Sequence, residues 1–188
     1  MDLSSLNAEQ KKAVETLNGP VLILAGAGSG KTRALTYRVA NLIDHGVPAR
    51  AILALTFTNK AAREMKDRII SLVGEKAAEE AWISTFHSTC ARILRRHIGF
   101  LGYETDFTIY DSDDQRAVIR HVVKDLKLDS KAYKERQMAA FISDCKTQGL
   151  TPDDALRMSR YAFQTAWADI YRAYEKRLRE NNALDFDD

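Results

Sequence analysis

The stretch "LILAGAGSGKTR", residues 22–33, joins a short apolar run to a glycine-rich loop that ends in Lys-Thr. From Ala25 to Thr32 it reads A-x-x-x-x-G-K-T, which is the phosphate-binding pattern with alanine in place of the leading glycine. Backbone N–H groups of residues 28–32 would converge on a β-phosphate at the positive end of a helix dipole. Lys31 would reach the β- and γ-phosphates, and the Thr32 hydroxyl would ligate Mg²⁺. The pattern predicts a nucleoside triphosphate site; the alternative is a strand-to-helix turn that binds nothing.

Residues around this loop predict an α/β fold. Apolar runs at 20–26, 51–57 and 81–86 are bounded by turn residues and separated by stretches long enough for a helix, which is typical of βαβ units and of a parallel sheet covered on both faces. Between the runs, helical spacing predicts helices that end at Gly46 and Gly74. We expect the core of a P-loop protein here.

After about residue 108 the strand pattern vanishes and four helical patterns follow. The first begins at a Ser/Asp cap near residue 111, and another begins with Thr151 as cap and Pro152 in the first helical position. The final stretch "ALDFDD", residues 183–188, leaves the helical pattern. We expect a core over 1–108, an all-helical subdomain over 109–181 and a return toward the core over 182–188.

Composition is that of a globular protein, with 45% hydrophobic and 29% charged residues in 188. Residues 1–107 carry 14 Lys/Arg against 11 Asp/Glu, and residues 108–188 carry 14 against 15, so any binding of a polyanion must depend on local clusters. Cys90 and Cys145 lie far apart without metal-type spacing. No apolar run is long enough to span a membrane, and we expect a cytoplasmic protein.

Two further motifs place an aromatic residue beside hydroxyls where a predicted strand ends. "LTFTNKAAREM", residues 55–65, contains Phe57 flanked by threonines, and "ISTFHSTCARILRRH", residues 83–97, repeats the Thr-Phe pair at Phe86. Stacking on aromatic rings beside polar groups is a mode of binding single-stranded nucleic acid. The alternatives are that Phe57 is a core residue, that Thr58 is a helix cap and that His87 and the arginines of 92–96 are ordinary surface residues.

Gln10 in "LNAEQKKAV" also has two interpretations. Its amide offers the donor and acceptor that the N6/N7 edge of adenine requires, but Asn7 and Gln10 are also spaced as a capping box.

Together these motifs resemble the UvrD/Rep/PcrA family of superfamily 1A DNA helicases over essentially the whole chain. "LNAEQKKAV" is similar to the family's Q motif, "AGAGSGKTR" to Walker A, "LTFTNKAAREM" to motif Ia, "ISTFHS" to motif Ib and "LDFDD" to the return from a helical insertion. The resemblance implies a RecA-like motor core interrupted by a helical subdomain, ATP and Mg²⁺ as cofactors, and single-stranded DNA and single-strand/duplex junctions as partners.

The resemblance also implies roles for individual residues. Lys31 and Thr32 would be catalytic, with Thr32 on Mg²⁺, and Gln10 would contact adenine. The nucleotide site as a whole would comprise Gln10, Ala25, Gly26, Ala27, Gly28, Ser29, Gly30, Lys31, Thr32 and Arg33. The DNA track would comprise Phe57, Thr58, Asn59, Lys60, Thr85, Phe86 and His87.

The chain departs from the family pattern near its last residues, because no apolar strand precedes Asp187 and Asp188 to make them a Walker B pair. We expect these 188 residues to belong to a 3′-to-5′ DNA helicase of repair or replication and to be inactive alone as an ATPase, because the Asp-Glu pair and a second motor domain are missing. The alternatives are a P-loop phosphotransferase such as a small-molecule kinase, and a non-catalytic nucleic-acid-binding module.

Overall fold

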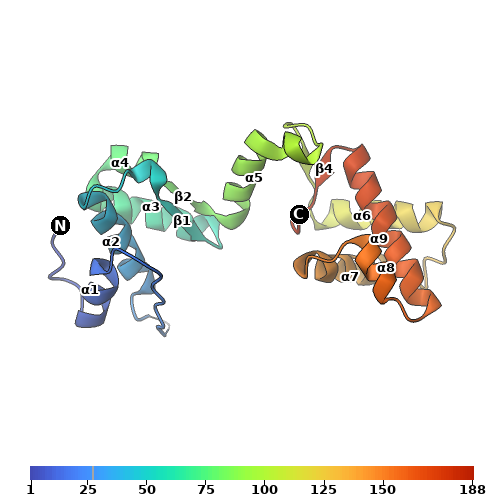
Figure 1. Ribbon diagram of the computed structural model, residues 1–188, viewed down its shortest axis with the longest axis horizontal. Coiled ribbons are helices and arrows are strands. Elements are labelled where there is room, and N and C mark those ends of the chain that lie inside the picture. Colours follow the sequence, from blue (N-terminus) through green and yellow to red (C-terminus); the bar gives the residue numbers. More distant parts are fainter. Residues whose placement is uncertain (27) are drawn as a thin grey trace. The chain divides into compact units, whose positions relative to one another are not determined.

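Residues 1–26 and 28–188 are described by the computed structural model, and they divide into two units, Met1–Arg92 and Ile93–Asp188 (Figure 1). The first unit mixes helices with a small sheet. Its elements are α1 (Ala8–Glu15), α2 (Lys31–Asp44), the 3₁₀ turn η1 (Ala49–Ala51), β1 (Leu53–Thr56), α3 (Asn59–Val73), α4 (Glu75–Glu80), β2 (Trp82–Thr85) and the first part of α5 (Phe86–His97).

The sheet of the first unit consists of β1 and β2, which run parallel in a register from Leu53 opposite Trp82 to Thr56 opposite Thr85. Both strands were expected from the apolar runs, and both are confirmed. The core packs Ala54 of β1 against Val39 of α2 and Met65 and Ile69 of α3. Leu53 is half exposed while Ala54 is buried, so β1 is covered more fully on one face than on the other.

The expected strand over residues 20–26 is wrong. No strand forms there among the described residues, and Leu22 and Leu24 are 82% and 86% exposed. A strand needs a neighbour to complete its backbone hydrogen bonds, and in the described chain β1 pairs only with β2. Apolar composition therefore predicted a strand at 20–26, but no strand of the described chain pairs with this segment.

Helix boundaries in the first unit follow the local signals. The Thr58 hydroxyl accepts from the Ala61 N–H and caps α3, and Gly74, with φ +84°, ends that helix. Glycine is favoured at such an angle because a Cβ would be strained there.

The second unit is mainly helical. It contains η2 (Ile98–Leu101), β3 (Thr108–Ile109), α6 (Ser112–Asp125), α7 (Glu135–Thr147), α8 (Pro152–Met158), α9 (Ala162–Glu180) and β4 (Ala183–Leu184). The expected caps are confirmed: Asp111 accepts from two N–H groups at the start of α6, and Thr151 caps α8 with Pro152 in the first turn. Its core gathers Ile119, Met138, Ile142 and Tyr174 from three of these helices.

The expectation that strands vanish after residue 108 is wrong in one detail. β3 and β4 pair in parallel, with Thr108 donating to Asn182 O at 3.0 Å and Tyr110 donating to Leu184 O at 2.8 Å. Two residues are too short to show strand periodicity in a sequence, which is why the pair was missed. The division into a core, an insertion and a return stays a prediction. Within residues 1–26 and 28–188, no helix is long and apolar enough to cross a membrane.

Candidate nucleotide and nucleic-acid sites

The glycine-rich loop leads directly into α2, which begins at Lys31. Gly28 and Gly30 have φ angles of +75° and +83°, so both residues adopt a left-handed backbone that glycine tolerates best. Among the described residues, the backbone N–H groups of Thr32 and Arg33 donate to no acceptor, as is usual in the first turn of a helix. These open amides can bind an anion.

The Lys31 ammonium turns back onto its own loop. It donates to the carbonyl oxygens of Ala25 at 2.8 Å and Gly26 at 2.6 Å. These bonds hold a cation at the mouth of the loop, and a phosphate oxygen would compete with the two carbonyls for it. Ala27, one of the expected nucleotide contacts, lies outside the described residues.

The capping-box interpretation of Gln10 is confirmed, and its contact with adenine stays a prediction. Its side chain accepts from the Asn7 N–H at 3.1 Å, and Gln10 N–H donates to Asn7 Oδ1 at 2.9 Å, which is a complete capping box. Its Nε2 also donates to Ser29 O at 3.0 Å, so the same amide ties α1 to the loop. A Cβ on Gly30 would lie 2.6 Å from that Nε2. The close approach of Gln10 therefore depends on glycine at position 30.

A cavity of about 330 Å³ lies between α1 and the loop. Its lining includes Gln10, Gly26, Ser29 and Lys31 together with the apolar side chains of Ile23 and Leu24. An apolar wall beside a few directed polar groups is typical of small-molecule sites. Outside this lining, Thr32 and Arg33 are exposed, and the Arg33 guanidinium lies 5.7 Å from the ring centroid of Tyr37. The residues present fit a nucleotide with its phosphates at the start of α2.

Phe57 and Phe86 form an exposed aromatic pair. Their ring centroids are 5.3 Å apart, and the side chains are 90% and 45% exposed. Each follows the last residue of a strand, and because β1 and β2 are parallel both rings lie at the same edge of the sheet. The core interpretation of Phe57 is wrong, whereas Thr58 does cap α3.

The remaining expected DNA contacts surround this pair. Asn59 and Lys60 are exposed in the first turn of α3, and His87 is exposed in the first turn of α5. Thr85 is buried, and its hydroxyl oxygen accepts from the Ser88 N–H at 3.2 Å, a bond that helps to hold the start of α5. Thr58 is exposed as well, so four of these five side chains lie at the surface, together with the two rings.

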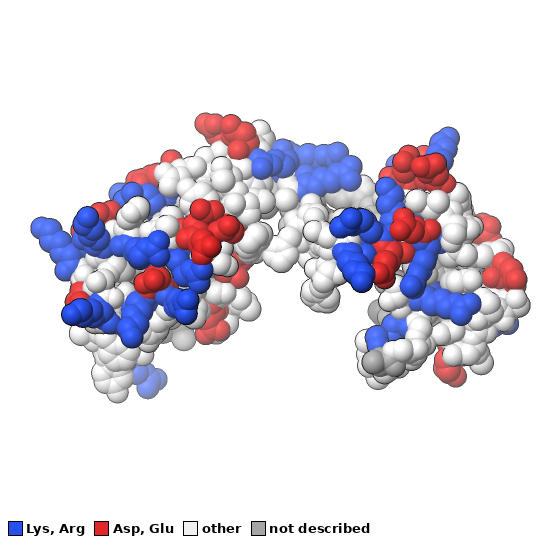
Figure 2. Space-filling model, turned by 180° about the vertical axis from the view of Figure 1, so that it is seen from behind, with Lys and Arg blue, Asp and Glu red and all other residues white. Residues whose placement is uncertain are grey.

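Arg92 and Arg95 on α5 contact aromatic rings of the protein. Arg92 lies over the Trp82 ring at 4.4 Å, and Arg95 lies over Phe107 at 3.9 Å and donates to Thr105 O at 2.6 Å. Both arginines are exposed, and these contacts hold their side chains against the protein surface. On the face seen in Figure 2, basic and acidic side chains are interspersed in both units.

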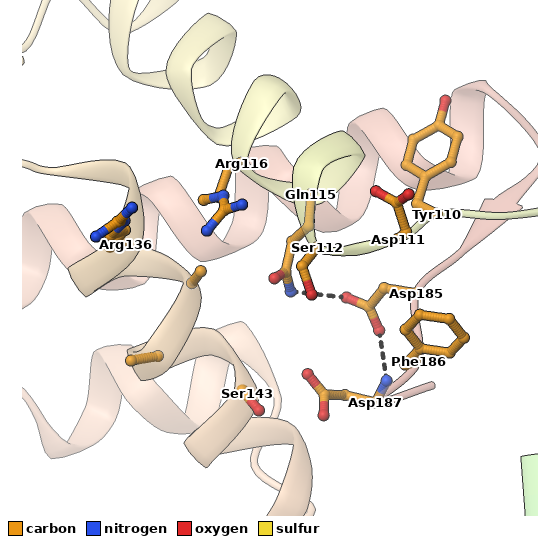
Figure 3. Close-up of a pocket in the computed structure, with 12 residues that line it drawn as sticks. Tyr110, Asp111, Ser112, Gln115, Arg116, Arg136, Ser143, Asp185, Phe186 and Asp187 are labelled. Carbon is orange, nitrogen blue, oxygen red and sulfur yellow. Dashed lines mark hydrogen bonds between the residues drawn. The ribbon is translucent and has the colours of Figure 1, made fainter.

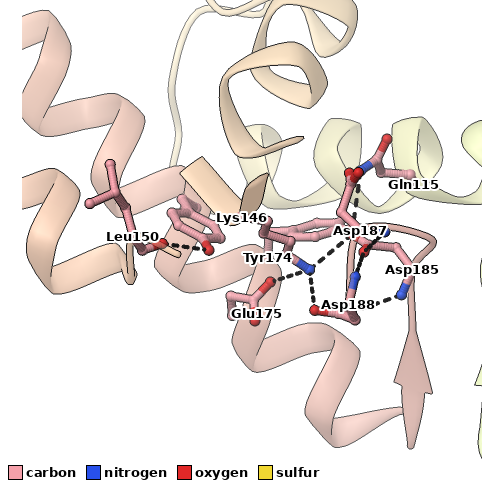
Figure 4. Close-up of polar contacts among 9 residues, drawn as sticks. Gln115, Lys146, Leu150, Tyr174, Glu175, Asp185, Asp187 and Asp188 are labelled. Carbon is pink, nitrogen blue, oxygen red and sulfur yellow. Dashed lines mark hydrogen bonds and ion pairs between the residues drawn. The ribbon is translucent and has the colours of Figure 1, made fainter. Parts of the chain in front are cut away.

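A buried charged cluster in the second unit was not anticipated. The Lys146 ammonium lies 2.9 Å from Glu175, 3.0 Å from Asp185 and 2.7 Å from Asp188 (Figure 4). Asp185 also accepts from the Tyr174 hydroxyl at 2.7 Å. The only signal in the sequence was the apolar-acidic stretch 183–188, and nothing pointed to its partner on α7.

Burial and charge oppose each other in this cluster. Burial by itself lowers the pKa of Lys146, but the carboxylates of Asp188 and Glu175 outweigh it and raise that pKa above its usual value. For a carboxylate the effect of burial has the opposite direction, and it raises the pKa of Asp188. For Asp185 the effect of burial is outweighed by Lys146 and by the Tyr174 hydrogen bond, so its pKa lies below the usual range. The cluster therefore holds Lys146 and Asp185 as an ion pair.

A second cavity, of about 340 Å³, opens beside this cluster. Figure 3 shows Arg116 and Arg136 on one side and Asp185 with Asp187 on the other, and Gln115 donates to Asp185 at 3.4 Å. Both signs of charge line it, so it selects no simple class of ligand.

Comparison with known proteins agrees with these motifs. A model of the UvrD/REP helicase N-terminal domain matches residues 6–188. Proteins named ATP-dependent DNA helicase PcrA, from Staphylococcus aureus and from Staphylococcus epidermidis, are each 49% identical to the chain over 187 residues. The match covers 99% of this chain and 26% of each relative, so the chain spans about a quarter of their length. The chain belongs to the UvrD/REP helicase family.

Proposed function

We propose that the chain is the ATP-binding and single-stranded-DNA-contacting part of an ATP-dependent 3′-to-5′ DNA helicase or translocase in repair or replication. The observation that carries the proposal is the exposed pair of Phe57 and Phe86 at one edge of a parallel sheet, in the same unit as the phosphate loop. The names of the relatives, ATP-dependent DNA helicase PcrA, support the same activity.

ATP would bind along the cavity between α1 and the loop. Gln10 would face the base, Arg33 would lie beside the nucleotide, and Lys31 with the open amides of α2 would hold the phosphates. The backbone of Ala25, Gly26, Ala27, Gly28, Ser29 and Gly30 would complete the site. The Thr32 hydroxyl would hold Mg²⁺, which would neutralise the charge of the phosphates.

DNA would stack its bases on Phe57 and Phe86. The polar residues Thr58, Asn59, Lys60, Thr85 and His87 would border the strand, and a single-strand/duplex junction would be the natural substrate of the whole motor. Stacking is sequence-tolerant because every base has a π-face, as a translocating motor requires. The cytoplasm, where DNA and ATP meet in a bacterial cell, is the proposed location.

Turnover requires groups that these residues do not provide. β4 is followed by Asp185 and Phe186, and in the described chain no strand ends in an Asp-Glu pair. We expect the 188 residues to bind ATP without hydrolysing it, since positioning of water and stabilisation of the transition state supply most of the acceleration in phosphoryl transfer.

A cross-titration tests the proposal. Binding of a fluorescent ATP analogue and of a labelled oligo-dT is measured for the native chain, Lys31→Ala and Phe57→Ala. We expect Lys31→Ala to weaken binding of the nucleotide alone by at least tenfold, and Phe57→Ala to weaken binding of the oligonucleotide about 5- to 160-fold, since stacking contributes roughly 1–3 kcal/mol per base. If neither variant changes either affinity, the proposal is wrong. If the variants change only the affinity for the nucleotide, a small-molecule phosphotransferase becomes the better proposal. If they change only the affinity for the oligonucleotide, a non-catalytic nucleic-acid-binding module becomes the better proposal.

A further inference from the structure

A cavity of about 300 Å³ lies between α3 and the start of α5, in the first unit. One stripe of α3 forms a wall, because Asn59, Arg63 and Lys66 recur at helical spacing of four and three. The opposite wall consists of the end of β2 and the first turn of α5, with Ser84, Thr85 and Ser88.

The charge of this lining has one sign. Arg63 and Lys66 are its ionisable residues, and neither forms an ion pair with a carboxylate among the described residues. The Asn59 amide and three hydroxyl groups are the other polar side-chain groups of the lining, and Thr85 Oγ1 donates to Ser88 Oγ at 2.9 Å. Two cations and several hydroxyl groups without a carboxylate make a site for an anion with several acceptor oxygens.

The cavity adjoins the exposed aromatic pair. Its wall residue Thr85 directly precedes Phe86, and its wall residue Asn59 follows Phe57 by two positions. A nucleotide whose base stacks on either ring carries its phosphate a short distance from that base, so the phosphate falls within reach of the lining.

We propose that this cavity binds a backbone phosphate of the single strand whose bases stack on Phe57 and Phe86, with Arg63 and Lys66 as its cations. The inference rests on the proposed function, because it assigns a phosphate subsite to the same strand. It also separates two kinds of contact: the rings hold bases, and the cavity holds the sugar-phosphate chain.

Salt dependence measures phosphate contacts. Each contact to a single strand adds about 0.7 to the negative slope of log K against log salt concentration. The 188-residue chain is titrated with labelled oligo-dT from 0.05 to 0.2 M salt, as native protein, Arg63→Gln and Lys66→Gln. Arg68→Gln and Lys76→Gln are matched controls, because they remove the same charges from α3 and α4 outside the cavity lining. We expect each test variant to reduce the slope by up to about 0.7, the share of the one phosphate that the cavity holds, and each control to leave it unchanged.

An oligomer of abasic sites distinguishes this inference from the function on which it rests. Because this oligomer has no bases, Phe57→Ala should not change its affinity, while Arg63→Gln should reduce the salt-dependence slope as much as it does with oligo-dT. If Phe57→Ala weakens oligo-dT but both test variants keep the slope of their controls, the phosphate subsite is wrong and the aromatic track stands. If Phe57→Ala has no effect on oligo-dT, the proposed function fails with it. Circular dichroism of each variant confirms that its fold is intact.

Discussion

The Lys146 ammonium lies 3.0 Å from the Asp185 carboxylate, and their side chains are only 6% and 3% exposed. The pair joins α7 to the residue that follows β4, where it also meets Glu175 and Asp188. Such a pair is retained because breaking it leaves an uncompensated buried charge.

Lys146→Met should destabilise the second unit by about 3–5 kcal/mol, the usual effect of removing one partner from a buried ion pair. Urea unfolding followed by circular dichroism measures the loss. Lys176→Met is the matched control: Lys176 pairs with Glu180 at 3.8 Å on the surface, and such pairs contribute roughly 0.3–0.5 kcal/mol. Equal losses in the two variants would show that Asp185 tolerates burial without its cation.

Tyr171 should make the stability of the fold fall at alkaline pH. Burial, reinforced by the charge of Glu175, raises the pKa of Tyr171 to about 12, and its hydroxyl donates to Leu150 O at 3.1 Å. An unfolded tyrosine titrates near pH 10, so its contribution is complete below that pH and is lost as the pH rises from about 10 to 12. Unfolding midpoints at pH 8 and pH 11 should differ less for Tyr171→Phe than for the native chain. An identical fall in both proteins contradicts the prediction.

Gly30→Ala should weaken nucleotide binding more than Gly28→Ala. Both glycines have φ above +70°, so alanine is strained at either position, but only at Gly30 would the new Cβ meet another residue, at 2.6 Å from Gln10 Nε2. Gln10 would have to leave Ser29 and the cavity wall. Titration of a fluorescent ATP analogue measures the affinities, and in the Gln10→Ala background the difference between the two glycine variants should disappear.

Asn182 should respond differently to alanine and to glycine. It has φ +46°, its Oδ1 accepts from the Glu104 N–H at 2.9 Å, and its Nδ2 donates to Asp106 at 3.0 Å. Asn182→Gly loses the hydrogen bonds, whereas Asn182→Ala loses them and adds left-handed strain of roughly 1–2 kcal/mol. In chemical denaturation the free energy of unfolding should therefore be highest for the native chain, lower for Asn182→Gly and lowest for Asn182→Ala. Equal stability of Asn182→Gly and Asn182→Ala would show that left-handed backbone strain at position 182 does not affect stability.

The sequence predicted what depends on local chemistry and missed what depends on distant partners. Thr58, Thr151 and Gly74 mark helix boundaries through bonds to their own neighbours, and the structure confirms all three. Residues 20–26 were expected as a strand because they are apolar. The expectation was wrong because apolar composition carries no information about whether a pairing strand is present. Similarly, Lys146 reads as an ordinary helix residue, since its partners Asp185 and Asp188 lie some forty positions away.

For the candidate sites, motif order located the loop and the aromatic pair, but it did not predict the contacts of individual side chains. Gln10 proved to be both a capping residue and a contact of the loop. Arg95 turned out to pack on Phe107. In both cases spacing gave the position of the residue and only the fold gave its contacts.

The two-residue pairing of β3 with β4 has a topological consequence. Because Thr108 lies opposite Ala183, the intervening chain departs and comes back at adjacent points, about 4.8 Å apart across a parallel ladder. A segment with adjoining ends can be lengthened, shortened or exchanged for another without redirecting the chain on either side. Residues 109–182 thus leave and rejoin the β3–β4 pair at one place, and a short linker between Thr108 and Ala183 should span the gap that their removal leaves.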